Sequence, residues 1–175
     1  MRACSAVRWG SLFLGLGAMT AACRPKTTTA SDAVLQFYTV RDALGGSGAP
    51  SAKELAALRP YIADTLARGL TLADSLRQAD IARAPDEKPR FVEGDLFSSM
   101  FEGPTAHRVM PPLATVPVLV PVEFTNDSQR PVVRWTDTAV VIWHDGHWQV
   151  QDVRYGGTWA FGNKGSLLRA LFSTP

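Results

Sequence analysis

The residues best suited to chemistry crowd into one stretch, TAVVIWHDGHWQVQDVRYGG, at positions 138–157. It holds two histidines, two aspartates and two tryptophans, which are side chains that serve as acid–base groups, metal ligands and aromatic walls. Asp145-Gly146 stands in the middle and favours a type I′ turn, because both central residues of that turn need positive φ. The stretch is therefore predicted to be a β-hairpin with strands over 131–144 and 147–155.

The turn fixes which residues of the predicted hairpin lie opposite each other. His144 faces His147, Trp143 faces Trp148, Ile142 faces Gln149, Val141 faces Val150, Ala139 faces Asp152, and Asp137 faces Arg154. Alternation then assigns the side chains to two faces. One face carries Trp143, Trp148, Val141, Val150, Asp152, Asp137 and Arg154, and the other carries both histidines, Ile142, Gln149, Val140, Gln151, Val153 and Tyr155.

The two histidines are expected to be a solvated turn tip rather than a metal site. A zinc site needs three or four ligands, and no third ligand lies near His144 and His147 in the sequence. Asp137 and Arg154 are expected to form a cross-strand ion pair contributing less than about 1 kcal/mol. No metal and no cofactor are predicted.

Asp152 is the candidate acid–base residue of the hairpin, although no catalytic residue is assigned. It shares the predicted face with Trp143 and Trp148, and a carboxylate in such surroundings is either paired with Arg154 or held in a cavity with a raised pKa. Groups with perturbed pKa values gather at functional sites. Trp143, Trp148, Asp137 and Arg154 are therefore candidate pocket residues around Asp152.

A second candidate pocket stretch is GDLFSSMFEG at positions 94–103. Asp95 and Glu102 stand there among Phe97, Met100 and Phe101, a pattern that suits the mouth of a cavity. The simpler interpretation is a turn whose Asp and Ser side chains bond to their own backbone. Both interpretations stay open.

Helical periodicity dominates the first half of the chain and strand alternation the second. A first helix is predicted from a cap at Ser31 or Asp32 to Leu44, a second after the capping box Ser51/Glu54, a third over 61–84 that is interrupted or bent near Gly69, and a last one after Ser166. TVPVLVPVEF at 115–124 reads as a strand, placed at a sheet edge or beside a bulge because Pro117 and Pro121 lack N–H groups. These elements predict one α+β domain over 31–175.

The N-terminus has the pattern of a secretory signal peptide over residues 1–22. Arg2 and Arg8 precede an apolar run from Trp9 to Met19, which is far shorter than the roughly 20 residues of a membrane-spanning helix. The ending Thr20-Ala21-Ala22-Cys23 resembles the lipobox of bacterial lipoproteins, which implies a lipid-modified Cys23 as the first mature residue. The alternative is a plain cut that leaves a free thiol. Residues 23–30 are expected to form the lipidated cysteine and a polar tether.

Composition argues against nucleic acid as a partner. The chain carries a formal net charge of +2, and removal of Arg2 and Arg8 with the leader brings it to neutrality. The remaining basic residues are scattered among acids, whereas a phosphate-tracking groove needs them clustered in excess.

The stretches KPRFVEGDLFSSMFEG and GHWQVQDVRYGG resemble a group of bacterial lipoproteins with an uncharacterised domain, whose fold is similar to the nuclear transport factor 2-like cone. The resemblance implies helices packed on a curved antiparallel sheet, with binding or catalytic sites inside the cone. The lipidated Cys23 implies a location in the cell envelope, and Arg24 rather than Asp after the cysteine favours the periplasmic face of the outer membrane. The superfamily contains both enzymes and non-enzymatic modules, so the fold alone assigns no reaction.

Two functions are open from the sequence. The favoured one is a lipid-anchored, non-catalytic binding or interaction module, whose partner is a small amphiphilic ligand or another envelope protein. The alternative is an enzyme of the isomerase, dehydratase or hydrolase type that uses Asp152 as acid or base. A homodimer built on the second face of the sheet is a further expectation, since Val140, Ile142, Val153 and Tyr155 would make that face partly apolar.

Overall fold

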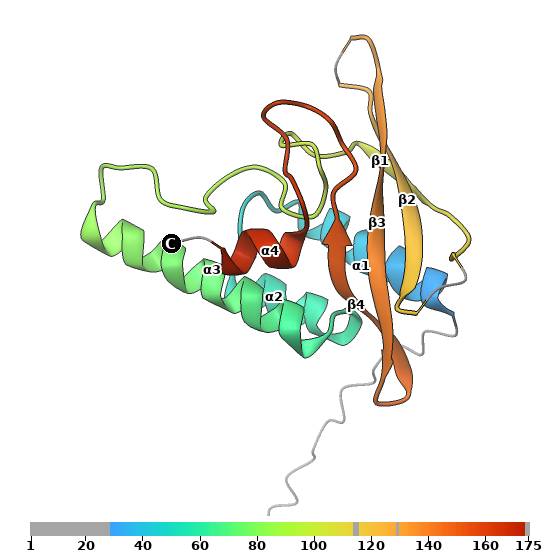
Figure 1. Cartoon of the computed structure of the whole chain (residues 1–175). Helices are drawn as coiled ribbons and strands as arrows, with labels where there is room; N and C mark the ends of the chain where they lie inside the picture. Colours follow the sequence, from blue (N-terminus) through green and yellow to red (C-terminus); the bar gives the residue numbers. More distant parts are fainter. Residues whose placement is uncertain (1–28, 114–115, 129, 174–175) are drawn as a thin grey trace, which may run out of the picture.

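The computed structural model describes residues 29–113, 116–128 and 130–173. The predicted leader, Cys23 and most of the tether lie outside these residues. In chain order the elements are α1 (Ala30–Leu44), α2 (Ala52–Leu58), the 3₁₀ turn η1 (Arg59–Tyr61), α3 (Asp64–Arg83), β1 (Ala106–Val109), β2 (Val118–Asn126), β3 (Val133–His144), β4 (His147–Arg154) and α4 (Leu167–Phe172). The α+β class is confirmed: helices pack on an open antiparallel sheet of order β1-β2-β3-β4 (Figure 1).

Capping explains where the first two helices begin. Ser51 caps α2, as predicted, by a reciprocal box with Glu54. The cap of α1 is Thr29 rather than Ser31 or Asp32. Asp32 instead occupies the third helical position, where its side chain accepts from the Thr29 N–H while the Thr29 hydroxyl accepts from the Asp32 N–H.

The third helix runs without interruption through Gly69, so the predicted interruption is wrong, and the alternative of a bend there stays a prediction. Gly69 is buried at the contact with α4. A Cβ atom at this position would lie 3.0 Å from Leu171 Cδ1 and 3.2 Å from Phe172 Cε2. The missing side chain therefore lets α4 pack closely against α3.

The proline-bearing strand β2 lies inside the sheet, between β1 and β3, so of its two predicted placements, at a sheet edge or beside a bulge, the edge placement is wrong. The reason is a strand that the sequence analysis missed: β1 pairs with residues 122–125 of β2. Beyond β1, the Pro121 carbonyl accepts from the Met110 N–H at 2.9 Å. The missing N–H of Pro121 faces this same side, where regular pairing has already ended.

A β-bulge changes the predicted register of the β3–β4 hairpin. The pairs from His144/His147 to Val141/Val150 are confirmed, but Val140 then pairs with Asp152, which leaves Gln151 as the extra residue. Beyond the bulge Ala139 faces Val153, and Thr138 faces Arg154. The predicted Asp137–Arg154 opposition is therefore wrong.

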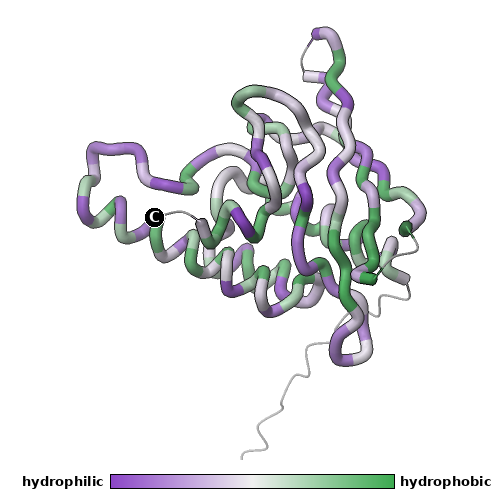
Figure 2. Tube along the Cα trace, viewed as in Figure 1, coloured by the Kyte–Doolittle hydropathy of each residue, from purple (hydrophilic) through white to green (hydrophobic). Residues whose placement is uncertain are grey.

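The core lies between the helices and one face of the sheet. Hydrophobic residues gather there, whereas hydrophilic residues mark the far end of α3 and the loop that follows it (Figure 2). Its centre is a chain of aromatic rings running from α1 to β3: Phe37 to Tyr38 at 4.9 Å, Tyr38 to Phe124 at 5.2 Å, and Phe124 to Trp135 at 5.4 Å between centroids. These buried rings fill the face of the sheet that the helices cover, where the resemblance placed a site.

The bulge also removes the basis for the expected dimer face. Val153 is turned into the core and is fully buried, and Val140 is buried as well. Tyr155 packs against the core and donates its hydroxyl to the Leu96 carbonyl at 2.6 Å. The four side chains therefore do not form an exposed apolar face.

Candidate functional site

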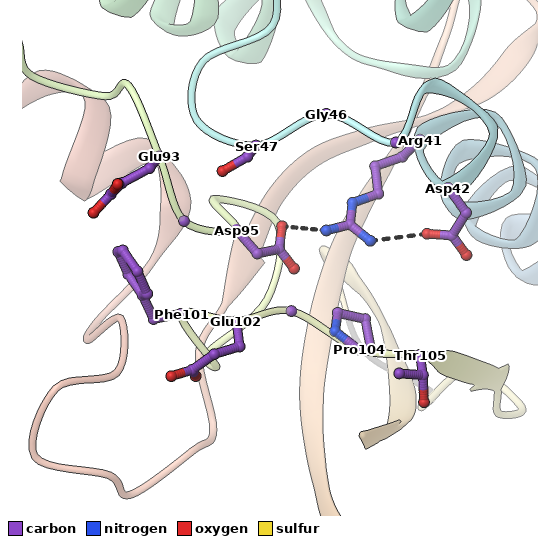
Figure 3. A pocket seen from close by; sticks show the side chains of 13 residues that line it. Arg41, Asp42, Gly46, Ser47, Glu93, Asp95, Phe101, Glu102, Pro104 and Thr105 are labelled. Atoms are coloured by element: carbon purple, nitrogen blue, oxygen red, sulfur yellow. Dashed lines mark hydrogen bonds and ion pairs between the residues drawn. The ribbon is translucent and has the colours of Figure 1, made fainter. Parts of the chain in front are cut away.

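A cavity of about 580 Å³ opens at the rim of the domain, between the C-terminal end of α1, the loop 45–48 and the irregular segment 91–105. Its charged lining residues are Arg41, Asp42, Glu93, Asp95 and Glu102, and Phe101 stands beside them (Figure 3). This volume is in the range of small-molecule pockets. We call it the acidic cavity.

Arg41 holds the floor of the acidic cavity together. Its Nη2 lies 2.6 Å from Asp95 Oδ1 and its Nη1 lies 2.9 Å from Asp42 Oδ1. Burial opposes the charge of Arg41, but Asp95 and Asp42 outweigh it, so its pKa is raised. Asp42 also contacts His107, with 2.9 Å between Oδ2 and Nδ1. Burial alone would raise the pKa of Asp42, but the hydrogen bonds from His107 and Arg41 lower it.

The second carboxylate oxygen of Asp95, Oδ2, has no hydrogen-bond partner in the described part of the chain. The side chain is 6% exposed as a residue, and Oδ1 accepts from both Arg41 and the Phe97 N–H. Oδ2 is buried and has no hydrogen-bond partner among the described residues. A Cβ atom at Gly103 would lie 3.3 Å from it, so this glycine lets the backbone pack closely against the carboxylate. An unsatisfied buried carboxylate oxygen can accept from a hydrogen-bond donor such as a water molecule or a ligand group.

The segment 91–105 has no helix or strand, yet buried hydrogen bonds hold it in place. The Tyr38 hydroxyl donates to the Phe97 carbonyl at 3.0 Å, and the Tyr155 hydroxyl donates to Leu96. The Asn163 amide donates to the carbonyls of Asp95 and Ser98, both at 2.7 Å. Burial, followed by the nearby carboxylates, raises the pKa of both tyrosines, so each remains a donor. The cavity wall is thus pre-formed.

Asp137, on β3, also holds the segment 91–105 in place. It is 1% exposed, and its Oδ2 accepts from the Ser99 N–H at 2.7 Å and from Trp135 Nε1 at 3.2 Å. Its Oδ1 accepts from the Ser99 hydroxyl and from the Gly156 N–H, the latter at 2.8 Å. Four donors to one buried carboxylate make Asp137 a structural anchor rather than a pocket residue.

A second cavity, of about 400 Å³, adjoins the acidic cavity and shares Phe101 and Glu102 with it. Its remaining lining residues are Met100, Trp159, Phe161 and Gly162, and we call it the aromatic cavity. Phe161 is 95% exposed, whereas the Trp159 ring stands edge-on against Trp135 at 5.3 Å. Phe101 lies directly on Gly94, where a Cβ atom would come within 2.3 Å of its ring.

The structure does not bring the candidate residues of the hairpin into one pocket. Trp143 is 56% exposed at the far end of β3, where it contacts Trp148 edge-on at 5.3 Å. Arg154 is exposed at the other end of the hairpin. Asp95 and Glu102, by contrast, both line the acidic cavity, and Asp95 also accepts from the Phe97 N–H two residues further on, as the turn interpretation expects.

Asp152 leaves the tryptophan face because of the bulge. Its Oδ1 accepts from the Val153 N–H at 2.8 Å and from the Leu168 N–H at 2.9 Å, in the first turn of α4. Only one of the two histidines differs from the expectation. His144 is exposed as predicted, but His147 is only 7% exposed, because its ring folds back to the Asp145 carbonyl, 3.2 Å from Nδ1.

Sequence reasoning missed Arg41 and the aromatic loop residues Trp159 and Phe161. Arg41 lies in the last turn of a predicted helix that ends before GGSG, and nothing in the sequence paired it with Asp95. The stretch YGGTWAFGNKG did carry a signal, since two large aromatic side chains stand among glycines that cannot bury them locally.

No family model, curated protein sequence or solved structure matches the chain. Across residues 29–113, 116–128 and 130–173, no helix combines the length and the apolar character needed to cross a membrane. Nor does this part of the chain bring three His, Cys, Asp or Glu side chains together as a metal site. The fold and the paired cavities define an α+β protein with a polar and an aromatic compartment at its rim.

Proposed function

We propose that this protein is a lipid-anchored binding module of the bacterial cell envelope, which holds a small amphiphilic ligand in the acidic and aromatic cavities. The observation that carries the proposal is the pairing of the two cavities across Phe101 and Glu102. One compartment offers carboxylates and the other offers aromatic rings, so a ligand with one polar and one apolar end would satisfy both.

A pre-formed wall supports binding as the role of this region. Tyr38, Tyr155, Asn163 and Asp137 all use buried hydrogen bonds to fix a segment that has no regular structure of its own. A shorter connection between α3 and β1 would be enough to hold the fold together. Long irregular loops in compact domains are usually functional, so the length of this segment favours a role in binding. A rigid wall also lowers the entropic cost of binding.

The finer fold assignment belongs to the same proposal. The contact of α1 with every strand of the described antiparallel sheet supports a nuclear transport factor 2-like cone as the finer fold. In the proposed cone, aromatic side chains would fill the concave side and the ligand would be held at the rim.

The enzymatic alternative with Asp152 has less support. The carboxylate of Asp152 already accepts two backbone N–H groups, one of them at the start of α4, and it lines neither of the two cavities. A general acid or base must reach the substrate proton. The paired carboxylate is better suited to holding α4.

Native mass spectrometry of the full-length protein, extracted gently from membranes, tests the proposal. We expect a retained small molecule in the wild-type protein, and its loss in Phe101→Ala, which removes the wall shared by the two cavities. The matched control Phe172→Ala removes an exposed ring from α4 and should keep the ligand. Protein that carries no small molecule, or that co-purifies with a protein partner alone, would contradict the binding role.

The lipid anchor has its own test in intact mass and membrane fractionation. Cys23→Ser should abolish the added lipid mass and release the protein from membranes, because only the thiol can form the thioether. Cys4→Ser removes a cysteine that leaves with the leader and should change neither. An unmodified wild-type mass would contradict the anchor.

A further inference from the structure

The charges around the two cavities point to one class of amphiphile. The acidic cavity is lined by four carboxylates, those of Asp42, Glu93, Asp95 and Glu102, and by a single guanidinium, that of Arg41. An excess of one charge sign in a concave site attracts ligands of the opposite sign.

The cations in this region are already engaged. Arg41 is shared between Asp42 and Asp95, and Lys88 pairs with Glu93. Lys164, on the loop that forms the aromatic cavity, donates to the Trp159 carbonyl. His107 is oriented towards Asp42. These contacts leave no guanidinium or ammonium aimed at an anionic ligand among the residues that line the two cavities.

Two acidic groups of the acidic cavity keep a carboxylate oxygen without a partner among the described residues, although Asp95 is paired with Arg41 through its other oxygen. Glu102 is exposed, has no hydrogen-bond or ion-pair partner among the described residues, and lines both cavities. Asp95 is more than nine-tenths buried, and its Oδ2 lacks a partner in the described part of the chain. Figure 3 shows the Asp95 side chain between Arg41 and the Phe101–Glu102 stretch. A group that donates hydrogen bonds and carries positive charge suits both carboxylates, which line the same cavity.

The aromatic cavity suits the other end of such a ligand. Phe101 and Glu102 stand at the boundary, so a positive group held by the carboxylates lies next to an aromatic ring. Aromatic faces attract cations, which adds to the Coulombic attraction. The exposed Phe161 and the partly buried Trp159 would cover an apolar body.

We infer that the ligand is a cationic amphiphile, an organic amine whose ammonium group binds at Glu102 and Asp95 while its apolar body lies against Phe101, Trp159 and Phe161. This inference rests on the proposed function, since it names the ligand class of the same two cavities.

Three probes of matched shape test the inference on the full-length protein: 4-phenylbutylamine, 4-phenylbutan-1-ol and 4-phenylbutanoate. They share the phenyl body and differ in the charge of the head group. Binding is followed by isothermal titration calorimetry at pH 7. We expect the amine to bind at least about tenfold more tightly than the alcohol, and the carboxylate to bind more weakly than both.

Two variants test separately how the charged head group and the phenyl body of the probes contribute to binding. Glu102→Gln should reduce the affinity for the amine by about tenfold and leave the affinity for the alcohol unchanged, because only the charged head depends on that carboxylate. Phe161→Ala should reduce the affinities for the amine and for the alcohol by the same factor, because both probes carry the phenyl body. Glu87→Gln, which removes an exposed carboxylate beyond the end of α3, is the matched control and should change neither affinity.

The outcomes distinguish this inference from the proposed function. Equal affinities for amine and alcohol, or tighter binding of the carboxylate, would overturn the cationic ligand while leaving a binding module that retains a molecule in native mass spectrometry. Absence of binding by all three probes would overturn the inference as well. Failure of the function itself would show separately, as wild-type protein that retains no small molecule.

Discussion

Ser99 donates both its backbone N–H and its hydroxyl to the buried carboxylate of Asp137. The two residues are 38 positions apart, and their contact ties the irregular segment 91–105 to the middle of β3. The Ser99 hydroxyl in turn accepts from the Gly157 N–H at 2.8 Å, which brings the loop of Trp159 to the same point. One buried carboxylate thus positions walls of both cavities.

Asp137→Asn is expected to destabilise the protein by about 3 kcal/mol, because whichever way the amide is turned, its NH₂ faces a backbone N–H of Ser99 or Gly156. Urea unfolding followed by tryptophan fluorescence measures the change. Asp145→Asn, in the exposed turn where Asn tolerates positive φ, should shift the free energy of unfolding by less than about 0.5 kcal/mol. Equal effects of the two variants would refute the anchoring role.

Gly94→Ala should lower stability by about 1–3 kcal/mol and also weaken binding of 4-phenylbutylamine. Gly94 has a φ of 81°, and the added Cβ would displace the Phe101 ring that separates the cavities. Gly146→Ala is the matched control: its φ is 78°, but nothing lies within 4 Å of the added Cβ. Gly146→Ala should therefore lower stability without weakening the binding of 4-phenylbutylamine. Retained binding in Gly94→Ala would show that the position of Phe101 does not matter.

Asp80 is expected to make stability depend on pH in the acid range. Hydrogen bonds from the Arg90 side chain and backbone hold the pKa of Asp80 at about 2, below the value of about 3.9 expected for the unfolded chain. A depressed pKa contributes stability above pH 4 that is lost as the pH falls towards 2. Asp80→Asn should thus be less stable than wild type at pH 7, and the difference should vanish near pH 2.

Urea midpoints of wild type and Asp80→Asn at pH 7, 4 and 2 provide the measurement. Asp86→Asn, on the exposed loop after α3, serves as control and should follow the wild-type midpoints throughout. A gap between wild type and Asp80→Asn that stays constant from pH 7 to pH 2 would contradict the role of the Arg90 contacts.

Ser51→Ala should destabilise the protein by about 1 kcal/mol through loss of the α2 cap. Ser51 donates to Glu54 and holds the pKa of that carboxyl below its usual value, so the variant should also raise the pKa of Glu54. Carbon-detected NMR titration reads the pKa, and urea unfolding reads the stability. Ser75→Ala, at an exposed position inside α3, should leave both unchanged or slightly improve stability.

Local signals in the sequence predicted most of the elements correctly. The capping box Ser51/Glu54, the turn Asp145-Gly146 and the cap Ser166 each act within a few residues, and all three lie where they were predicted. The hairpin register failed only past Val141, because a bulge that inserts Gln151 leaves no mark in an alternating strand. The short strand β1 was missed since four residues carry too little periodicity.

The candidate site was predicted only in part, because several of its contacts join residues that are far apart in the sequence. Asp95 and Glu102 were candidates from their apolar surroundings, and both line the acidic cavity. Arg41 could not be joined to Asp95, nor Ser99 to Asp137, because those contacts depend on how the sheet folds onto α1. The carboxylate of Asp137 was assigned to the wrong partner for the same reason, since one extra residue in β4 decides what it faces.

The most direct test of ligand binding in the two cavities is a two-dimensional ¹H–¹⁵N NMR titration of the full-length protein with 4-phenylbutylamine, followed at the tryptophan indole signals. Trp159 lines the aromatic cavity, whereas Trp143 and Trp148 lie together at the far end of the hairpin. We predict that the Trp159 signal moves in a saturable way while those of Trp143 and Trp148 stay in place. A shift confined to the hairpin tryptophans, or no shift in any indole signal, would contradict the account.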